Sequence, residues 1–450
     1  MNRKKSTTNV FRIACLGLTL ALAAGAALAQ QQSTLQNNNS ASTMYKVVDL
    51  GTLAGGAFSQ PFSLNRNGSV SGASMLTGGA LHAVVWANGG MTDLRTLGGM
   101  NSTAFAENTS GETVGEAETS LSDPNGEDFC AFGTHVQCLP FRAQNGVMAP
   151  LPVLGGNNGA VNQVNNRGLA VGFAENDIPD PACPSPQVLH FEPVVWTDGE
   201  AHQLPTYAGD ADGVALGVND AGQVAGASGL CAPLSPVLLY LQPVHALLWD
   251  RNRTIDLGNL GGVTGQAGGN IAWAINNKGQ VIGVSDLPGD STFHAFLWTK
   301  HTGMQDLGAL PGHVASTASG INDAGTVVGL SFDANFNGHA FIWQHGVMSD
   351  LNNLAPNSPM YLFSACGINA QGEITGLGVT SNGEFHAYLA TPHHRSPWNA
   401  SVTPSQVSDE SGGTINLSDH DRQMLQQQLR LLRRFTDAPP DPCRGSCKPK

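Results

Sequence analysis

The sequence predicts an all-β protein: a seven-bladed β-propeller of four-stranded repeats, closed by its N-terminal strand and followed by a short C-terminal helix and tail. Three observations lead to this prediction: a turn signature that recurs seven times, a second hairpin after each signature, and an incomplete repeat at each end of the array. The composition agrees. With 55 glycines, 25 prolines and only 12% charged residues, the chain suits many short strands joined by turns.

The signature N-x-x-G-x-x-x-G marks the first hairpin of each repeat. Apolar segments flank it, as in 271–276 before and 281–285 after one copy. Asparagine at the first position and glycine at the fourth suit a type I turn that rejoins the strand through a left-handed residue. The copies span residues 65–72, 108–115, 165–172, 219–226, 276–283, 322–329 and 369–376.

A second hairpin follows each signature. A strand such as His294-Ala-Phe-Leu-Trp298 leads through a polar turn to Met-x-Asp-Leu, as in 304–307, and then to a glycine-rich connection such as 258–262. Four strands in each of seven units are typical of a propeller. A stacked solenoid is the alternative, but it needs capping units, and none is visible in the sequence.

The two ends of the array predict how the ring closes. Residues 47–50 read as a fourth strand without the first three, and residues 386–390 read as a third strand without a fourth. We therefore expect residues 46–50 to pair antiparallel with 386–390, which would protect both edges of a propeller spanning 45–390.

Histidine and aspartate vary together in the second hairpin. In the two repeats where Cys138 and Glu192 replace the histidine, Pro150 and Gln203 replace the aspartate. Pairing the strands across their turn puts the two side chains diagonally on one face, within reach of each other. Because the pair recurs around the ring, we predict structural contacts rather than catalytic ones. The expected pairs are His82–Asp93, His245–Asp256, His294–Asp306, His339–Asp350 and His386–Asp49.

These strings, together with 321–329, resemble the bacterial extracellular HAF-repeat family over about residues 45–390. The resemblance implies a repeat scaffold, and the family brings no general activity that can be carried over. Repeats 2 and 3 depart from it by lacking the histidine and aspartate, and repeat 7 has Ala390 where tryptophan is usual.

The chain's ends predict export. Residues 1–29 read as a signal peptide, because a basic start (Arg3, Lys4, Lys5 and Arg12) precedes an apolar stretch and Ala27-Leu28-Ala29. A membrane anchor is the alternative, but the apolar stretch is short and a polar run follows it. We interpret 30–44 as a disordered leader, 391–416 as a linker, and 417–450 as a helix with a cysteine-containing tail. The expected location is extracellular or periplasmic.

The net charge and the cysteines limit the kinds of partner and site that we expect. Cleavage would change the net charge from −13 to −17, which disfavours nucleic acid, and no other apolar run could form a transmembrane anchor. In an oxidising compartment we expect disulfides Cys130–Cys138 and Cys443–Cys447, consider Cys183–Cys231 possible, and expect Cys366 to be buried and free. A zinc site is the rival interpretation, but no C-x-x-C pair exists.

Long insertions indicate where a ligand could bind. From the last signature glycine to the histidine position, the seven repeats have 10, 23, 20, 19, 11, 10 and 10 residues. Repeats 2, 3 and 4 thus carry neighbouring long loops. Such loops carry function more often than scaffolds do. The leading hypothesis is a secreted scaffold that binds a protein or glycan through this face; the alternative is a propeller hydrolase or lyase acting on polysaccharide.

The sequence contains no motif that identifies a catalytic residue, a metal site or a cofactor. Acids in the long loops, Asp123, Glu127, Asp128, Asp177 and Asp180, could pair as in a glycosidase, but loop acids are usually solvated. The segment 333–338 matches half of a calcium loop, but Gln344 stands where a bidentate glutamate is needed, which favours a polar turn.

Overall fold

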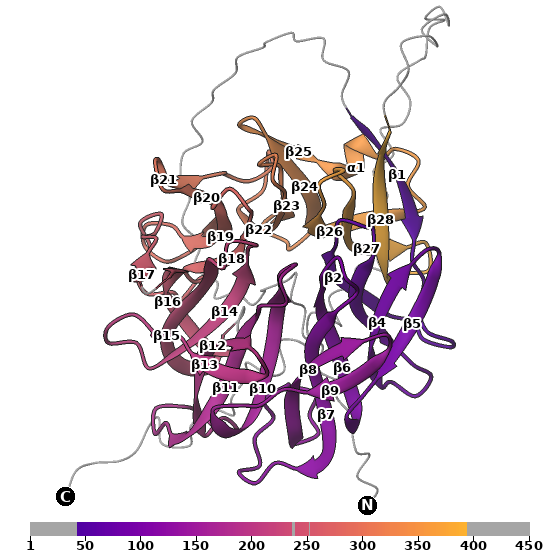
Figure 1. The fold of residues 1–450 in the computed structure, drawn as a ribbon. Helices are drawn as coiled ribbons and strands as arrows, with labels where there is room; N and C mark the ends of the chain where they lie inside the picture. The colour runs from indigo at the N-terminus through magenta and orange to yellow at the C-terminus, as the bar shows by residue number, and fades with distance from the viewer. Residues whose placement is uncertain (1–42, 236–238, 252, 394–450) are drawn as a thin grey trace, which may run out of the picture.

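A computed structural model of the protein describes residues 43–393, apart from 236–238 and 252. Its strands form seven four-stranded antiparallel sheets around a central axis, which is the propeller that the repeats predict (Figure 1). The expected signal peptide, nearly all of the leader and the linker, and the helix and tail with Cys443–Cys447 lie outside the described residues.

Each blade runs from an inner strand at the axis to an outer strand at the rim. Blade 1 has β2 (Ser59–Leu64), β3 (Val70–Met75), β4 (Leu81–Ala87) and β5 (Gly90–Arg95); blade 2 has β6 (Gly98–Glu107), β7 (Thr113–Ser122), β8 (Val136–Gln144) and β9 (Val147–Pro150); blade 3 has β10 (Gly155–Val164), β11 (Ala170–Pro179), β12 (Leu189–Thr197) and β13 (Glu200–Gln203); blade 4 has β14 (Asp212–Val218), β15 (Val224–Ser235), β16 (Leu239–Asp250) and β17 (Arg253–Asp256). Blade 5 has β18 (Ile271–Ile275), β19 (Val281–Asp286), β20 (Phe293–Thr299) and β21 (Gly303–Asp306); blade 6 has β22 (Ala315–Ile321), β23 (Val327–Phe332), β24 (Gly338–Gln344) and β25 (Val347–Asp350); blade 7 has β26 (Met360–Ile368), β27 (Ile374–Thr380), β28 (Phe385–His393) and β1 (Met44–Asp49).

The N-terminal strand closes the ring, as predicted. β1 pairs antiparallel with β28, with Met44 opposite His393 and Asp49 opposite Tyr388, so the two ends of the colour scale lie side by side (Figure 1). β28 continues to His393, three residues into the segment interpreted as a linker. Blade 7 therefore takes its outer strand from the start of the chain.

The signature asparagines tie the blades together as well as shaping the turns. Each Oδ1 accepts the backbone N–H groups two and four residues later. The residue between them, three after the asparagine, is the signature glycine, with φ between 73° and 84°. Each Nδ2 donates to the backbone carbonyl of the next blade's asparagine at 2.9–3.4 Å. We call this closed circle the asparagine ring; its members are Asn65, Asn108, Asn165, Asn219, Asn276, Asn322 and Asn369.

Every inner strand has a β-bulge at the same place, which raises its local twist near the axis. The extra residues are Phe62, Phe105, Asn162, Leu216, Trp273, Ser319 and Cys366. Phe62, Phe105, Leu216 and Trp273 belong to one hydrophobic cluster that draws residues from all seven blades. The rings of Phe62 and Phe105 meet edge to face with centroids 5.0 Å apart.

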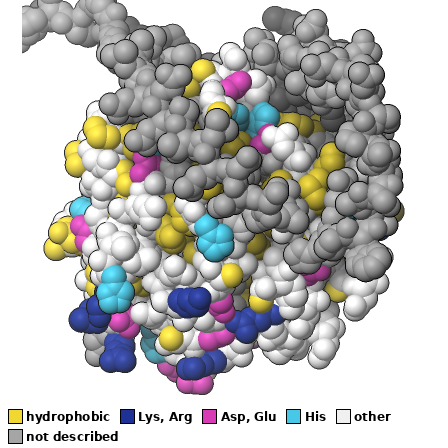
Figure 2. Space-filling view, turned by 90° about the horizontal axis from the view of Figure 1, so that it is seen from above, with side chains coloured by type: hydrophobic (Ala, Val, Ile, Leu, Met, Phe, Trp, Pro, Cys, Tyr) yellow, Lys and Arg dark blue, Asp and Glu magenta, His cyan; other side chains and the backbone are white. Residues whose placement is uncertain are grey.

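The connection after blade 6 contains α1 (Leu351–Leu354), which Asp350 caps by accepting the N–H of Asn352. No helix in the described part of the chain is long and apolar enough to cross a membrane. On the side seen in Figure 2, lysine and arginine side chains lie among acidic ones along one edge, and hydrophobic side chains are scattered over the other described residues in view.

Candidate functional site

The long insertions of blades 2, 3 and 4 form one connected surface. We call it the long-loop face and define it as residues 123–135, residues 180–188 and the adjoining ends of β7, β11 and β15. In blade 4 the insertion is mainly strand, because β15 and β16 each extend to 12 residues. This differs from the sequence-based expectation of a third long loop.

Two disulfides strengthen this face. Cys130 pairs with Cys138 inside the blade 2 insertion, with Cα atoms 6.0 Å apart. Cys183 pairs with Cys231 across blades 3 and 4, with Cα atoms 5.0 Å apart. The expected Cys130–Cys138 bridge is confirmed, and the Cys183–Cys231 bridge, which the sequence left as a possibility, is present. Cys366 is buried, as expected, but the expectation of a free thiol is wrong, because its sulfur takes part in a further disulfide.

A buried glutamate from blade 2 holds the blade 3 loop. Glu127 is fully buried, and its Oε1 accepts the N–H groups of Val188 at 2.7 Å and Leu189 at 2.9 Å. The amide of Gln187 lies between two glutamates, with Nε2 3.2 Å from Glu127 Oε1 and 2.8 Å from Glu175 Oε1. Burial and the neighbouring Glu127 charge raise the pKa of Glu175 to about 8, and burial also raises the pKa of Glu127. The pair therefore holds a proton near neutral pH.

Similar buried acids anchor the starts of inner strands. Glu118 Oε2 accepts the N–H and Nδ2 of Asn101, each at 2.9 Å, and Glu175 Oε2 accepts Asn158 Nδ2 at 2.9 Å. Asp286 plays this part in blade 5 by accepting the N–H groups of Gly268 and Gly269. These acids occupy the same position, three residues after the last signature glycine. Their contacts assign them a structural role that the sequence analysis missed.

Of the loop acids named from the sequence, some are buried and others lie at the surface. Asp123 is buried, and its Oδ2 accepts a hydrogen bond from Asn158 Nδ2 at 2.9 Å. Asp180 is also buried. Asp128 accepts the N–H of Gly133 at the surface, and Asp177 is exposed. The structure thus brings Asp123 and Glu127 into the interior of the loops, where backbone N–H groups and amides bind them, rather than into an open pocket.

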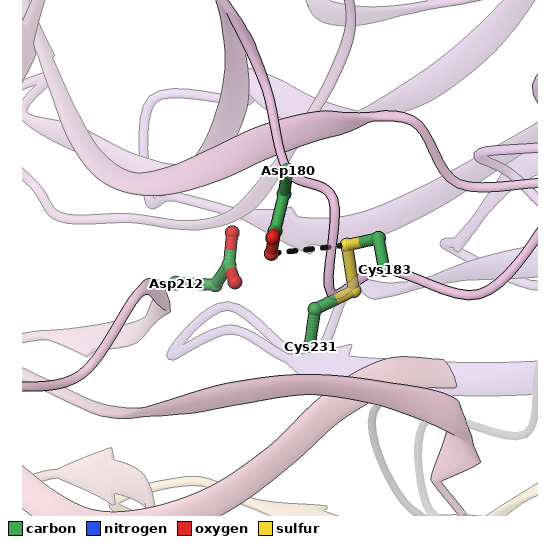
Figure 3. Close-up of side chains that lie close together, drawn as sticks. All are labelled: Asp180, Cys183, Asp212 and Cys231. Carbon is green, nitrogen blue, oxygen red and sulfur yellow. Dashed lines mark hydrogen bonds between the residues drawn. A yellow bond between two sulfur atoms is a disulfide. The ribbon is translucent and has the colours of Figure 1, made fainter.

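A second acidic group lies between blades 3 and 4. The carboxylates of Asp180 and Asp212 face one another beside the Cys183–Cys231 disulfide, and Asp180 Oδ2 is 3.4 Å from Cys183 Sγ (Figure 3). His190 Nδ1 lies 3.1 Å from Asp212 Oδ1 and 3.6 Å from Asp180 Oδ2. Burial raises the pKa of Asp212 to about 6, and burial together with the Asp212 charge raises the pKa of Glu192 to about 7.

The His–Asp contacts predicted on the outer strands are present in four blades. His82–Asp93, His294–Asp306, His339–Asp350 and His386–Asp49 all approach within 2.8–3.0 Å through Nδ1. Each of these aspartates also caps the N–H two residues later, which keeps it at the end of its strand. Their recurrence around the ring agrees with a structural role.

The fifth predicted pair is wrong. His245 Nδ1 lies 2.8 Å from Asp210 Oδ2 instead of contacting Asp256, although Leu247 pairs with Asp256 in the expected register. A bulge between β15 and β16 precedes His245, and Tyr207 stacks on its ring with centroids 4.0 Å apart. The buried Asp210 therefore takes the imidazole, while the exposed Asp256 caps Gly258.

A polar cavity of about 170 Å³ lies at the asparagine ring, on the face opposite the long-loop face. One residue from each blade follows the ring asparagine at this cavity: Arg66, Thr109, Asn166, Asp220, Asn277, Asp323 and Ala370. Arg66 spans to Asp323 at 3.1 Å, and Asp220 accepts the N–H and side-chain amide of Asn166. In the sequence, these residues indicate only turns.

No protein family model and no curated protein matches the sequence. Among solved structures, the chain is similar to the β-propeller domain of the Trilobed protease from Pyrococcus furiosus, at 8% identity and TM-score 0.42, covering 76% of this chain and 99% of that one. It is also similar to the Pyrococcus horikoshii acylaminoacyl peptidase (11% identity, TM-score 0.43, 76% of this chain) and to the Aleuria aurantia lectin (9%, 0.30, 79% of this chain and 97% of that one). The chain spans about half (53%) of the length of that peptidase. The strand topology itself establishes an all-β, seven-bladed β-propeller of four-stranded antiparallel sheets.

Proposed function

We propose that this protein is an exported β-propeller scaffold that binds a protein ligand through its long-loop face. The disulfides Cys130–Cys138 and Cys183–Cys231 support export, because such bonds persist mainly in oxidising compartments. The buried acids of this face, Asp123 and Glu127, are bound within the loops, which supports a binding surface over a polysaccharide-cleaving site.

Exposed apolar side chains on the long second strands of three neighbouring blades carry the proposal. Leu121 of β7 is 61% exposed, Ile178 of β11 is 56% exposed and Leu230 of β15 is 48% exposed. Large apolar side chains held in water by a rigid, disulfide-linked layer favour a partner that covers them. Aliphatic side chains fit a protein partner better than a sugar, which aromatic rings usually bind.

The test combines substitution with capture. The full chain is immobilised, exposed to secreted and periplasmic proteins of its source, and compared with a Leu121→Ser, Ile178→Ser, Leu230→Ser variant. Val147→Ser with Val347→Ser is the matched control, because these valines are 69% and 61% exposed at the opposite face. We expect a partner that the control variant retains and the triple variant loses.

Two outcomes would contradict the proposal. A captured partner that the triple variant retains would place binding elsewhere. Binding on a glycan array, or release of sugars from a polysaccharide panel, that survives the triple substitution would favour the carbohydrate alternatives.

A further inference from the structure

Three metal-binding side chains converge between blades 3 and 4, beside the Cys183–Cys231 disulfide. Asp180 follows β11, His190 lies in β12 and Asp212 begins β14. His190 Nδ1 is 3.1 Å from Asp212 Oδ1 and 3.6 Å from Asp180 Oδ2, and the two carboxylates have oxygen atoms within 4.8 Å of one another. Tetrahedral zinc bonds of 2.0–2.1 Å would place ligand atoms about 3.3 Å apart, a value between the two distances from His190 Nδ1.

The aspartate from blade 4 has an oxygen with no partner. Asp212 is fully buried, and its Oδ2 accepts no hydrogen bond, whereas Oδ1 accepts the N–H of Phe191 at 3.0 Å. Figure 3 shows this carboxylate directed toward Asp180. Two buried carboxylates side by side are unfavourable without a counter-charge. Of the described residues, His190 is the one basic side chain paired with either of them.

Backbone groups already orient the carboxylates. Asp180 Oδ1 accepts the N–H of Ala182 at 2.8 Å, which leaves Oδ2 facing His190. Outer contacts of this kind hold metal ligands in position. One imidazole and two carboxylates suit zinc, whereas calcium requires six to eight oxygen ligands.

We propose that Asp180, His190 and Asp212 bind one zinc ion beside the intact Cys183–Cys231 disulfide. The ion would link the blade 3 insertion to the first strand of blade 4 and supply the charge that the two carboxylates lack. His190 is partly exposed, with a side-chain accessibility of 21%, so the site is reachable from solvent. The proposal does not depend on the ligand of the long-loop face.

The experiment uses the purified, oxidised full chain, stripped with a chelator and titrated with zinc chloride. We expect about one zinc per chain by elemental analysis and a higher melting temperature with zinc. Asp212→Asn and His190→Gln should each weaken zinc binding by roughly tenfold or more, because even the loss of a residue that only hydrogen-bonds a metal ligand has an effect of that size. Asp210→Asn is the matched control, because it alters the neighbouring His245 contact without touching the site.

Cobalt provides a second readout, because its visible spectrum distinguishes oxygen and nitrogen ligands from thiolates. We expect a spectrum without thiolate charge transfer in the oxidised protein. Absence of stoichiometric zinc, or equal retention by His190→Gln and wild type, would overturn the proposal. Binding that appears only after a thiol reductant, with thiolate charge transfer, would also overturn it by assigning the metal to the cysteines.

Discussion

The imidazole Nδ1 of His386 lies 2.9 Å from Oδ2 of Asp49, although 337 residues separate them in the chain. The same contact joins His82 to Asp93 within a single repeat, only 11 residues apart. The blade that unites the two ends of the chain therefore reproduces the geometry of an ordinary blade.

Closure should stabilise the whole propeller. Deleting residues 44–49 should lower the unfolding midpoint in one cooperative transition, because it exposes the edge of β28. Asp49→Ala should have a smaller effect, about 1 kcal/mol, similar to Asp93→Ala in blade 1. Chemical denaturation would measure both. A deletion variant with the wild-type midpoint would contradict the closure argument.

Replacing one member of the asparagine ring should lower the stability of the propeller considerably. Asn219 is buried, accepts the N–H groups of Ala221 and Gln223, and donates to the carbonyl of Asn276 at 3.0 Å. Asn219→Ala should lower the free energy of unfolding by about 3 kcal/mol, because several buried groups lose their partners.

The adjacent Asn277 is the control for that variant. It also contacts neighbouring blades, through Asp220 and Asp323, but these hydrogen bonds are exposed. Asn277→Ala should therefore change the free energy of unfolding by only about 0.5 kcal/mol. Urea titrations of the two variants should separate them clearly. Equal effects would contradict the prediction that the buried hydrogen bonds of Asn219 stabilise the propeller more than exposed ones do.

The buried glutamates predict a loss of stability as the pH rises. The folded state raises the pKa of Glu175 from 4.5 to about 8, so folding favours its protonated form. This contribution is fully present below about pH 4.5 and is lost as the pH rises through 8. The melting temperature should therefore fall between pH 5 and pH 9, measured at constant ionic strength.

Glu175→Gln should reduce this slope, because the amide resembles the protonated acid and cannot ionise. The variant should melt at a higher temperature than wild type at pH 9. Glu200→Gln, with a side chain 78% exposed, should leave the slope unchanged. Aspartates such as Asp350 ionise below the range of pH 5 to pH 9. Burial opposes the ionisation of Asp350, but its hydrogen bonds to His339 and Asn352 hold its pKa below the usual value. A wild-type slope in Glu175→Gln would refute the assignment.

The two disulfides should differ in strength. The bridges close segments of 48 and 8 residues, for which loop entropy predicts about 4 and about 2.5 kcal/mol. The double serine variant at Cys183 and Cys231 should thus unfold at lower denaturant than the variant at Cys130 and Cys138. The reverse order would mean that native contacts, not chain entropy, dominate.

Repetition made most of the fold predictable. The turn glycines follow from a signature repeated seven times, four His–Asp contacts follow from a pattern present in five repeats, and the closing strand follows from the incomplete repeat at each end. The asparagine ring was missed because an asparagine present in every repeat shows no variation, and the turn already accounts for its oxygen. The Asp210 partner of His245 was missed because Asp210 lies in the preceding connection, outside the repeated hairpin. The Asp180–Asp212 group was missed because its members come from different blades.

The asparagine ring is independent of where the chain begins. Every member donates to its neighbour in the same rotational sense, across the boundary between blades 7 and 1 as across the others. Met44 and His393 are paired neighbours, so a short linker could join them. A circularly permuted chain, opened at the β24–β25 turn of blade 6, would keep all seven inter-blade bonds and should fold to the same propeller with a different closing strand.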